Sequence, residues 1–363
     1  MVARAATVAY TLGKMETAKK LGESPDPAPL RVGGLALAGR AMLAPMAGVT
    51  DPAMRRIAER YGASATVSEM VTADGLARGD RETRLRLACG GQGLGFAPRV
   101  IQIAARDRQG IAEAARHAQD CGAQWIDINM GCPCKRVTGG LAGSALMRDL
   151  DHAASLIASA VRAVGVPVSV KMRLGWDDAS RNAAELAQRA ENEGAVLVSV
   201  HGRTRAQFYN GAADWAAIGE VKRAVRIPVV ANGDCASPEA ARDMLRLTGA
   251  DAVMIGRAAL GRPWMVGDIA HYLATGKRRP EPTLATRGRI ALEHFEGLLV
   301  AMGASAGLRH ARTHLAAYAD HALGDAAQAR AEPRRALVTS AAPDEVRALI
   351  ECLFFHHYRE EAA

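Results

Sequence analysis

Aromatic residues are scarce in this chain, since Phe, Trp and Tyr together make up 4% of its 363 residues. The sequence also lacks any uninterrupted apolar run of about 18 residues, the length that a transmembrane helix needs, so we expect no membrane association. Its basic N-terminus lacks the continuous apolar segment of a secretory signal peptide. We therefore expect a cytoplasmic protein in which residues 1–28 form a disordered leader.

Cysteines are few and scattered. Six are present, no Cys-x-x-Cys pair occurs, and Cys132 and Cys134 have no second Cys or His cluster at zinc-finger spacing. An intracellular chain of this size keeps its thiols reduced. The sequence therefore predicts no metal site, and it leaves two interpretations of Cys132: a small buried apolar residue or a reactive thiol.

Acidic residues are outnumbered by basic ones, and the excess is local. The net charge is +8, and residues 29–282 alone hold 33 Lys and Arg against 25 Asp and Glu. Residues 283–363 hold nine against ten. A basic surplus gives affinity for anions, and here it falls in the segment that also carries the motifs described below.

The first expected strand is not followed by a Gly-x-Gly-x-x-Gly sequence, which disfavours an open doubly wound sheet, the alternative fold. Eight short apolar runs instead alternate with longer amphipathic segments. The runs are 41-AMLAPMA, 65-ATVSEM, 99-RVIQIA, 125-WIDINM, 167-PVSVKMR, 196-VLVSVHG, 228-PVVANG and 251-DAVMIG. Eight β/α units predict a TIM (β/α)8 barrel over residues 29–282. Helical patterns at 285–303, 306–322 and 342–358 predict a small all-helical domain over residues 283–363.

Polar or glycine residues stand at the ends of all the expected strands except the first, which ends in Pro45, Met46 and Ala47. In chain order the strand-end residues are Pro45, Met46 and Ala47, then Glu69, Gln102, Asn129 with Cys132, Lys171 with Arg173, His201 with Arg203, Asn232, Gly233 and Asp234, and Gly256 with Arg257. Because the carboxyl ends of barrel strands meet at the active-site face, we expect these residues to share one pocket.

The last two of these loops have the features of a phosphate site. Gly233 and Gly256 offer backbone amides and Arg257 adds a cation, although barrel turns also need glycine for purely structural reasons. Lys171 suits either a Schiff base or a place beside an electron-rich ring, and Gln102 suits the polar edge of a heterocycle. Together they favour a flavin over a bare sugar phosphate.

Cys132 follows a glycine at a strand end and precedes a proline, so we expect it on a stiff turn over the pocket. The neighbouring Lys135 and Arg136 should lower the pKa of its thiol. A general acid must instead be protonated when it acts, and a cysteine can serve that role near neutral pH. The spacing of Cys134 favours neither a buried nor a reactive thiol.

Several motifs carry a family resemblance. The strings APMAGVTD, VSEM, VIQI, DINMGCP, LAGSALM, VKMRLGW, HGRTRAQFYNG, ANGD and MIGRAALGRPW occur in order between about residues 31 and 320. In this respect the chain resembles the tRNA-dihydrouridine synthases, most closely their bacterial B-type branch, also described as nitrogen-regulation-like.

The resemblance implies an FMN-binding TIM barrel followed by a helical tRNA-binding domain, acting as a flavoprotein oxidoreductase. We also expect a monomer. NADPH or NADH would reduce the FMN, reduced FMN would deliver hydride to uracil C6 of a D-loop uridine, and Cys132 would protonate C5. The cofactor residues it implies are Pro45, Met46, Ala47, Gln102, Lys171, His201, Asn232, Gly233, Asp234, Gly256 and Arg257. The substrate residues are Asn129, Arg173, Lys135, Arg203 and Arg312.

The chain departs from the family pattern where Thr313 stands between Arg312 and His314 in place of the usual lysine. Two other functions fit parts of the sequence. A flavin barrel acting on a small molecule, such as an ene-reductase or a dihydroorotate-type dehydrogenase, needs neither the surplus of basic residues in 29–282 nor the helical domain. A non-catalytic RNA-binding or regulatory protein would not need Cys132.

Overall fold

The computed structural model describes residues 29–87, 97–323 and 331–355. The predicted leader, residues 1–28, lies outside the described residues. Within these ranges, every helix is too short or too polar to cross a membrane.

Eight parallel strands close into a ring. They are β3 (Ala41–Leu43), β4 (Ala65–Val67), β6 (Arg99–Ala104), β7 (Trp125–Met130), β8 (Val168–Arg173), β9 (Leu197–His201), β10 (Val229–Asn232) and β11 (Ala252–Ile255). Each pairs with the next, and β11 pairs with β3 to close the ring; the short β5 (Val71–Thr72) lies along β6. The predicted (β/α)8 barrel is therefore confirmed, and the open sheet is wrong.

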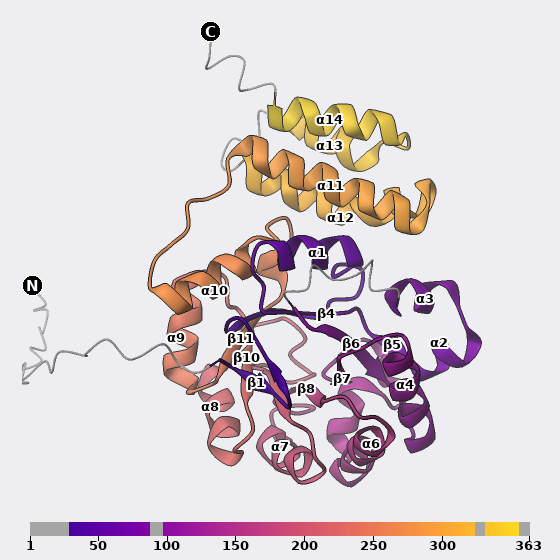
Figure 1. The fold of residues 1–363 in the computed structure, drawn as a ribbon, viewed down its shortest axis with the longest axis vertical. Coiled ribbons are helices and arrows are strands. Elements are labelled where there is room, and N and C mark those ends of the chain that lie inside the picture. The colour runs from indigo at the N-terminus through magenta and orange to yellow at the C-terminus, as the bar shows by residue number, and fades with distance from the viewer. Residues whose placement is uncertain (1–28, 88–96, 324–330, 356–363) are drawn as a thin grey trace, which may run out of the picture.

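Helices surround the ring in the order expected of βα units (Figure 1). They are α1 (Pro52–Arg60), α2 (Ala73–Arg78), α3 (Arg81–Leu87), α4 (Arg108–Asp120), α5 (Lys135–Thr138), α6 (Leu150–Ala163), α7 (Ala183–Asn192), α8 (Trp215–Ala224), α9 (Pro238–Thr248) and α10 (Met265–Thr275), with 3-10 turns η1 (Gly143–Arg148) and η2 (Arg257–Ala259). Their starts follow local chemistry, as at α9, where Ser237 caps the first turn, Pro238 follows and Gly249 ends the helix with φ +67°.

A hairpin plugs the amino end of the barrel. Its strands, β1 (Arg31–Val32) and β2 (Leu35–Ala36), place Val32 and Leu37 against interior side chains such as Met42, Trp125 and Met254. These residues form an apolar cluster inside the ring. The opposite, carboxyl end of the strands is therefore the end that can receive a ligand.

The C-terminal region is helical, with α11 (Leu284–Met302), α12 (Ala304–Leu323), α13 (Ala331–Thr339) and α14 (Pro343–Phe355) forming their own apolar core. The helix at 331–339 was not expected from the sequence. This core also takes in Ile57 of α1 and Trp264, so the bundle packs directly on the barrel (Figure 1). At Gly297 of α11, an added Cβ would lie 2.7 Å from Ala53 Cβ, so glycine permits this close approach.

Candidate active site

A cavity of about 460 Å³ opens at the carboxyl ends of the strands. This volume falls in the range of small-molecule sites. The lining includes nine of the eleven predicted cofactor residues: Pro45, Met46, Lys171, His201, Asn232, Gly233, Asp234, Gly256 and Arg257. The other two, Ala47 and Gln102, are not part of this lining. Pro45, Met46 and Met254 supply apolar surface, while Lys171 and Arg257 supply cations, so the cavity suits a flat ring with an anionic arm.

Lys171 stands in the wall of the cavity because the strands are in register. It pairs with Asn129 across β7 and β8, and its Nζ donates to Asn232 Oδ1 at 3.1 Å. Asn232 in turn donates from Nδ2 to the Met254 carbonyl at 2.8 Å, which fixes its amide. Burial and the nearby Arg173 lower the pKa of Lys171, and the buried Asp127 opposes that shift. The ammonium is thus held in place and only weakly solvated.

His201 is a neutral imidazole in this site. Burial, followed by the positive charges of Lys171, Arg173 and other neighbours, lowers the pKa of His201 to about 2. Its Nε2 lies 3.3 Å from Arg203 Nη1. A neutral ring beside a donor acts as an acceptor at that nitrogen.

Asp234 organises the cationic end of the cavity. It adopts φ +55°, and its two oxygens accept from the Arg203 guanidinium at 2.9 and 2.7 Å. Burial alone would raise the pKa of Asp234, but the hydrogen bonds from Arg203 and the Ala213 amide outweigh it, so the pKa lies below its ordinary value. Asp234 also lies 3.4 Å from Arg257 Nη2. This carboxylate therefore holds Arg257, whose side chain is 59% exposed, at the edge of the site.

Arg203 and Arg173, both predicted to touch a substrate, lie inside the wall with 2% exposure. Arg203 also donates to the Asn210 and Gly211 carbonyls, and Arg173 donates to the carbonyls of Gly131, Thr204 and Phe208. Both guanidiniums are thus bound to the surrounding loops. They stabilise the shape of the site in this structure.

The turn after β3 is closed on itself. The Met46 amide donates to Thr50 Oγ1 at 2.9 Å, and the Met46 carbonyl accepts from Val49, Thr50 and the Thr50 hydroxyl. Glu69 accepts from the Gly48 amide at 2.7 Å, which gives this buried acid a positioning role. A ligand therefore meets the side chain of Met46 more readily than its backbone.

Asn129 sets the turn that carries Cys132. Its Oδ1 accepts from the Gly131 and Cys132 amides at 3.2 and 2.9 Å, and its Nδ2 donates to Gln102 Oε1 at 2.8 Å. The Cys132 carbonyl accepts from Ser144 on the other side. Asn129, predicted to contact a substrate, thus acts on the backbone of the cysteine in this structure.

Burial raises the pKa of the Cys132 thiol. The Cys134 amide and the charges of Arg173 and Lys171 pull the pKa down by less. The expectation of a lowered pKa, based on Lys135 and Arg136, is wrong, because burial has the largest effect and raises it. Cys132 is therefore a protonated thiol at neutral pH, which suits a proton donor.

A buried chain of polar side chains runs beneath the cysteine turn. Gln102 is 1% exposed and donates from Nε2 to Asp127 Oδ2 at 2.7 Å, while Asp127 Oδ1 accepts from Ser169 at 2.5 Å. Sequence reasoning missed Asp127 and Ser169. The available signal was a charged residue in the middle of the otherwise apolar strand 125-WIDINM. Gln102 therefore links this acid to Asn129 from below the cavity.

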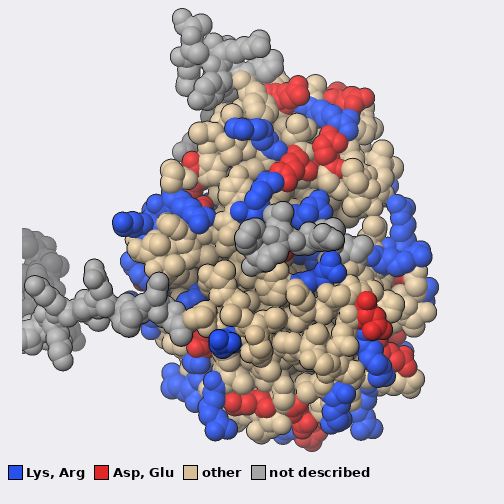
Figure 2. Space-filling view, in the orientation of Figure 1, with Lys and Arg blue, Asp and Glu red and all other residues tan. Residues whose placement is uncertain are grey.

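Basic side chains also lie outside the cavity. Lys135 is exposed on α5 and Arg312 on α12, and Arg78, Arg81 and Arg84 are exposed on α2 and α3. Arg86 instead contacts Glu82 and the Met70 carbonyl. On the face shown in Figure 2, basic groups gather mainly at the periphery, including beside α3, with acidic groups among them.

Comparison with known proteins gives concordant matches. The family model described as dihydrouridine synthase matches residues 42–357. The tRNA-dihydrouridine synthase B of Xanthomonas campestris pv. campestris is 49% identical over 293 residues, covering 80% of this chain and 87% of the relative. A probable tRNA-dihydrouridine synthase of Rhizobium leguminosarum bv. phaseoli is 46% identical over 315 residues, covering 86% and 95%.

Solved structures match at the level of the fold. A histamine dehydrogenase from Rhizobium sp. 4-9 aligns with a TM-score of 0.53 and 14% identity, over 74% of this chain and 50% of that one. A 6-hydroxypseudooxynicotine amine oxidase from Pseudomonas geniculata N1 aligns with a TM-score of 0.55 and 14% identity, over 73% and 52%. At this identity the likeness concerns the barrel architecture alone.

Proposed function

The chain belongs to the dihydrouridine synthase family, and we propose from this premise that it reduces the C5–C6 double bond of a D-loop uridine in tRNA to 5,6-dihydrouridine. The proposal makes it an oxidoreductase that uses FMN and takes its electrons from NADPH. The observation that carries the proposal is that the cavity and the protonated thiol of Cys132 both lie at the carboxyl end of the barrel. Cys132 is not part of the cavity lining, but Lys171, which is, acts electrostatically on its thiol.

The cavity residues fit FMN. An added Cβ at Gly256 would meet nothing nearer than Met46 Sδ at 3.7 Å, so the backbone there is open to a ligand. Met46 and Lys171 would hold the ring, and Gly233, Gly256 and Arg257 would hold the phosphate. Bound FMN, once reduced by NADPH, supplies a hydride, as cofactors commonly supply the redox chemistry.

Cys132 completes the reduction by giving its proton to C5 of the uracil. The hydride adds to C6, the C5–C6 π bond breaks, and the S–H bond of Cys132 supplies the proton for the new C5–H bond. The thiolate that remains lies near the positive charges of Arg173 and Lys171, which favour its formation, and it regains a proton from solvent. Asn129 keeps the Cys132 backbone in place through both steps.

The tRNA would meet the basic side chains outside the cavity. We propose that Lys135 and Arg312 contact its phosphates, since both are exposed, whereas the buried Arg203 and Arg173 shape the wall. A uridine must leave its stack to reach a barrel mouth, so the enzyme acts on a flipped base. The segment 29–282 then supplies the chemistry, and the helical segment from 283 onward assists in binding tRNA.

The test is a reaction in vitro with the purified protein, NADPH and tRNA that lacks dihydrouridine. Nucleoside mapping by mass spectrometry should find dihydrouridine at a D-loop position, and the protein should carry the visible spectrum of FMN. Cys132→Ala should retain FMN and NADPH oxidation but lose about 10²–10⁴-fold in dihydrouridine formation, the usual cost of losing a positioned acid.

Cys134→Ala is the matched control, because Cys134 is two residues away and exposed. It should form dihydrouridine at close to the rate of the unmodified protein. A loss in Cys134→Ala with none in Cys132→Ala would reject the assignment of the proton donor. Reduction of a small uracil derivative as fast as tRNA would reject tRNA as the substrate.

A further inference from the structure

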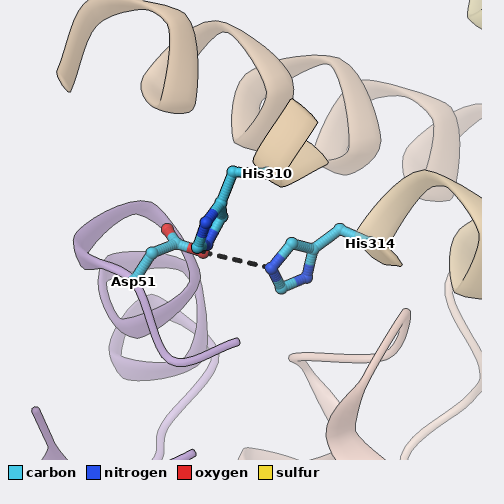
Figure 3. Close-up of side chains that lie close together, drawn as sticks. All are labelled: Asp51, His310 and His314. Carbon is cyan, nitrogen blue, oxygen red and sulfur yellow. Dashed lines mark ion pairs between the residues drawn. The ribbon is translucent and has the colours of Figure 1, made fainter. Parts of the chain in front are cut away.

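A cluster of one acid and three histidines lies where the bundle meets the barrel, and Figure 3 shows three of its members, Asp51, His310 and His314. Asp51 precedes α1, His294 lies on α11, and His310 and His314 lie one turn apart on α12. The distances from Asp51 Oδ2 to the Nε2 atoms of His294, His314 and His310 are 3.0, 3.2 and 3.9 Å. One carboxylate oxygen therefore faces three imidazole rings.

Hydrogen bonds within the protein do not account for this cluster. His314 is 2% exposed, its Nδ1 has no hydrogen-bond partner, and its Nε2 makes only the 3.2 Å contact with Asp51 Oδ2. The Nε2 of His310 is buried and also has no partner. A buried polar group left unpaired costs about 1–3 kcal/mol, so two such rings side by side need an explanation.

We propose that Asp51, His310 and His314 bind a divalent transition metal ion of the zinc type. One ligand atom from each residue can be chosen so that all three lie within 4.8 Å of one another. Zinc binds nitrogen and oxygen at about 2.0–2.2 Å in a tetrahedron, which separates neighbouring ligand atoms by about 3.3 Å. The distances from Asp51 Oδ2 to the Nε2 atoms of His314 and His310, 3.2 and 3.9 Å, are close to that separation. Two imidazoles and one carboxylate favour such an ion over Mg²⁺ or Ca²⁺, which prefer oxygen.

The remaining atoms of the cluster already have the contacts of an outer shell. Asp51 Oδ1 accepts from the Ala53 and Met54 amides at 2.8 and 3.0 Å, so this oxygen caps α1, and the other oxygen, Oδ2, which His294 also contacts, is the one that would bind the ion. His294 bonds to Asp51 through Nε2 and to the Tyr318 hydroxyl through Nδ1, at 3.0 and 3.1 Å. His294 thereby orients the carboxylate, as outer-shell partners of metal ligands usually do.

The proposed ion would join two parts of the fold that are far apart in the sequence. Asp51 belongs to the barrel, and both histidine ligands belong to the bundle. Three protein ligands leave a fourth position for water. The site lies apart from the catalytic cavity, whose lining contains none of these three residues. The ion would act as a structural clamp that fixes the bundle on α1.

The test uses the full-length protein, freed of metal by dialysis against a chelator and titrated with Zn²⁺ in a calorimeter. Co²⁺ then serves as a spectroscopic probe, because its visible bands report tetrahedral coordination and its near-ultraviolet bands report thiolate ligands. We expect one equivalent to bind with the visible bands, without thiolate bands, and to raise the melting temperature. Outer-shell changes cost about 10–100-fold in metal affinity, so removing a ligand in His310→Ala should cost at least about 100-fold.

His310→Ala is expected to fold, because the His310 side chain is 19% exposed. His321→Ala, on the same helix and outside the cluster, is the matched control and should bind as the unmodified protein does. Absence of saturable binding in the unmodified protein would overturn the proposal without reference to any variant. Thiolate bands, or equal affinity in His310→Ala and the unmodified protein, would also overturn it by placing the metal elsewhere.

Discussion

The buried chain beneath Cys132 predicts that Asp127→Asn damages catalysis from a distance. Asp127 only accepts hydrogen bonds, whereas the Gly131 and Cys132 amides at the other end of the chain only donate. Between these ends, Gln102 and Asn129 each turn an amide nitrogen toward the acid and an amide oxygen toward the cysteine. The acid therefore determines which way both amides face.

An asparagine at position 127 presents one acceptor and one donor in place of two acceptors. If its nitrogen faces Gln102, two hydrogen-bond donors face each other at one link of the chain. That link lies at Gln102, at Asn129 or at the Cys132 turn. If its nitrogen faces Ser169, the Ser169 hydroxyl loses its acceptor, because it also receives a hydrogen bond from Trp125 at 2.8 Å. Either arrangement leaves one buried group unpaired, so we expect unfolding to become easier by about 1–3 kcal/mol. If the unpaired group lies at the cysteine turn, the same free energy opposes the correct placement of Cys132 and lowers the rate of dihydrouridine formation about 5–150-fold.

The assay measures single-turnover formation of dihydrouridine with reduced enzyme, together with urea unfolding of the same preparation. Ser169→Ala is the matched control, because it removes the other partner of Asp127 without reversing either amide. We expect both variants to lose stability, and only Asp127→Asn to lose rate in addition. Equal rates in the two variants would mean either that the asparagine nitrogen faces Ser169 or that the amide chain does not orient Cys132. Gln102→Leu, which interrupts the chain, decides between them, and an unchanged rate in that variant would refute the idea.

Two further predictions concern the cavity. Arg257→Ala should release FMN more readily but keep the fold, because the Arg257 guanidinium is exposed and its removal leaves the barrel intact. The flavin content of the purified protein measures this, and Arg246→Ala, at another exposed arginine, is the control. The pKa of His201 is about 2 in the folded chain and about 6.5 in the unfolded chain. Below pH 6.5 the unfolded chain therefore takes up a proton that the folded chain does not, so the free energy of unfolding drops as pH falls. By about pH 5 this amounts to about 2 kcal/mol, which His201→Gln should abolish in urea titrations while the exposed His117→Gln retains it.

The barrel could be predicted because its signals are local. Each β strand is a short apolar run, and helix ends such as Ser237 and Gly249 are encoded by capping residues within a few positions. The helix at 331–339 was missed because its sequence, AEPRRALVT, has a proline near its start and no clear apolar stripe. Its packing against α12 and α14 stabilises it instead.

The candidate site was predictable in membership but less so in the role of each residue. Strand-end positions identified Lys171, His201 and Asn232 because barrel topology brings such positions together. The same rule counted Arg203 as a substrate contact, although its charge is satisfied by Asp234 inside the wall. The expectation of a lowered pKa for Cys132 came instead from its neighbours in the sequence. Those neighbours are exposed, and burial has the larger effect on the thiol. Burial and side-chain orientation depend on the packing of the whole fold, so the position of a residue in the sequence does not reveal them.

The loop after β3 connects the cavity to the cluster of Asp51, His310 and His314. Met46 lines the cavity and is held by Thr50, and the next residue, Asp51, caps α1 and faces the histidines of the bundle. Because Thr50 and Asp51 are both fully buried, neither can move without disturbing its own hydrogen bonds. A change in how the bundle sits on Asp51 must therefore reach Met46 within five residues of chain. In the proposed function, tRNA bound to the bundle would therefore have a short route along the chain to Met46, which lines the cavity.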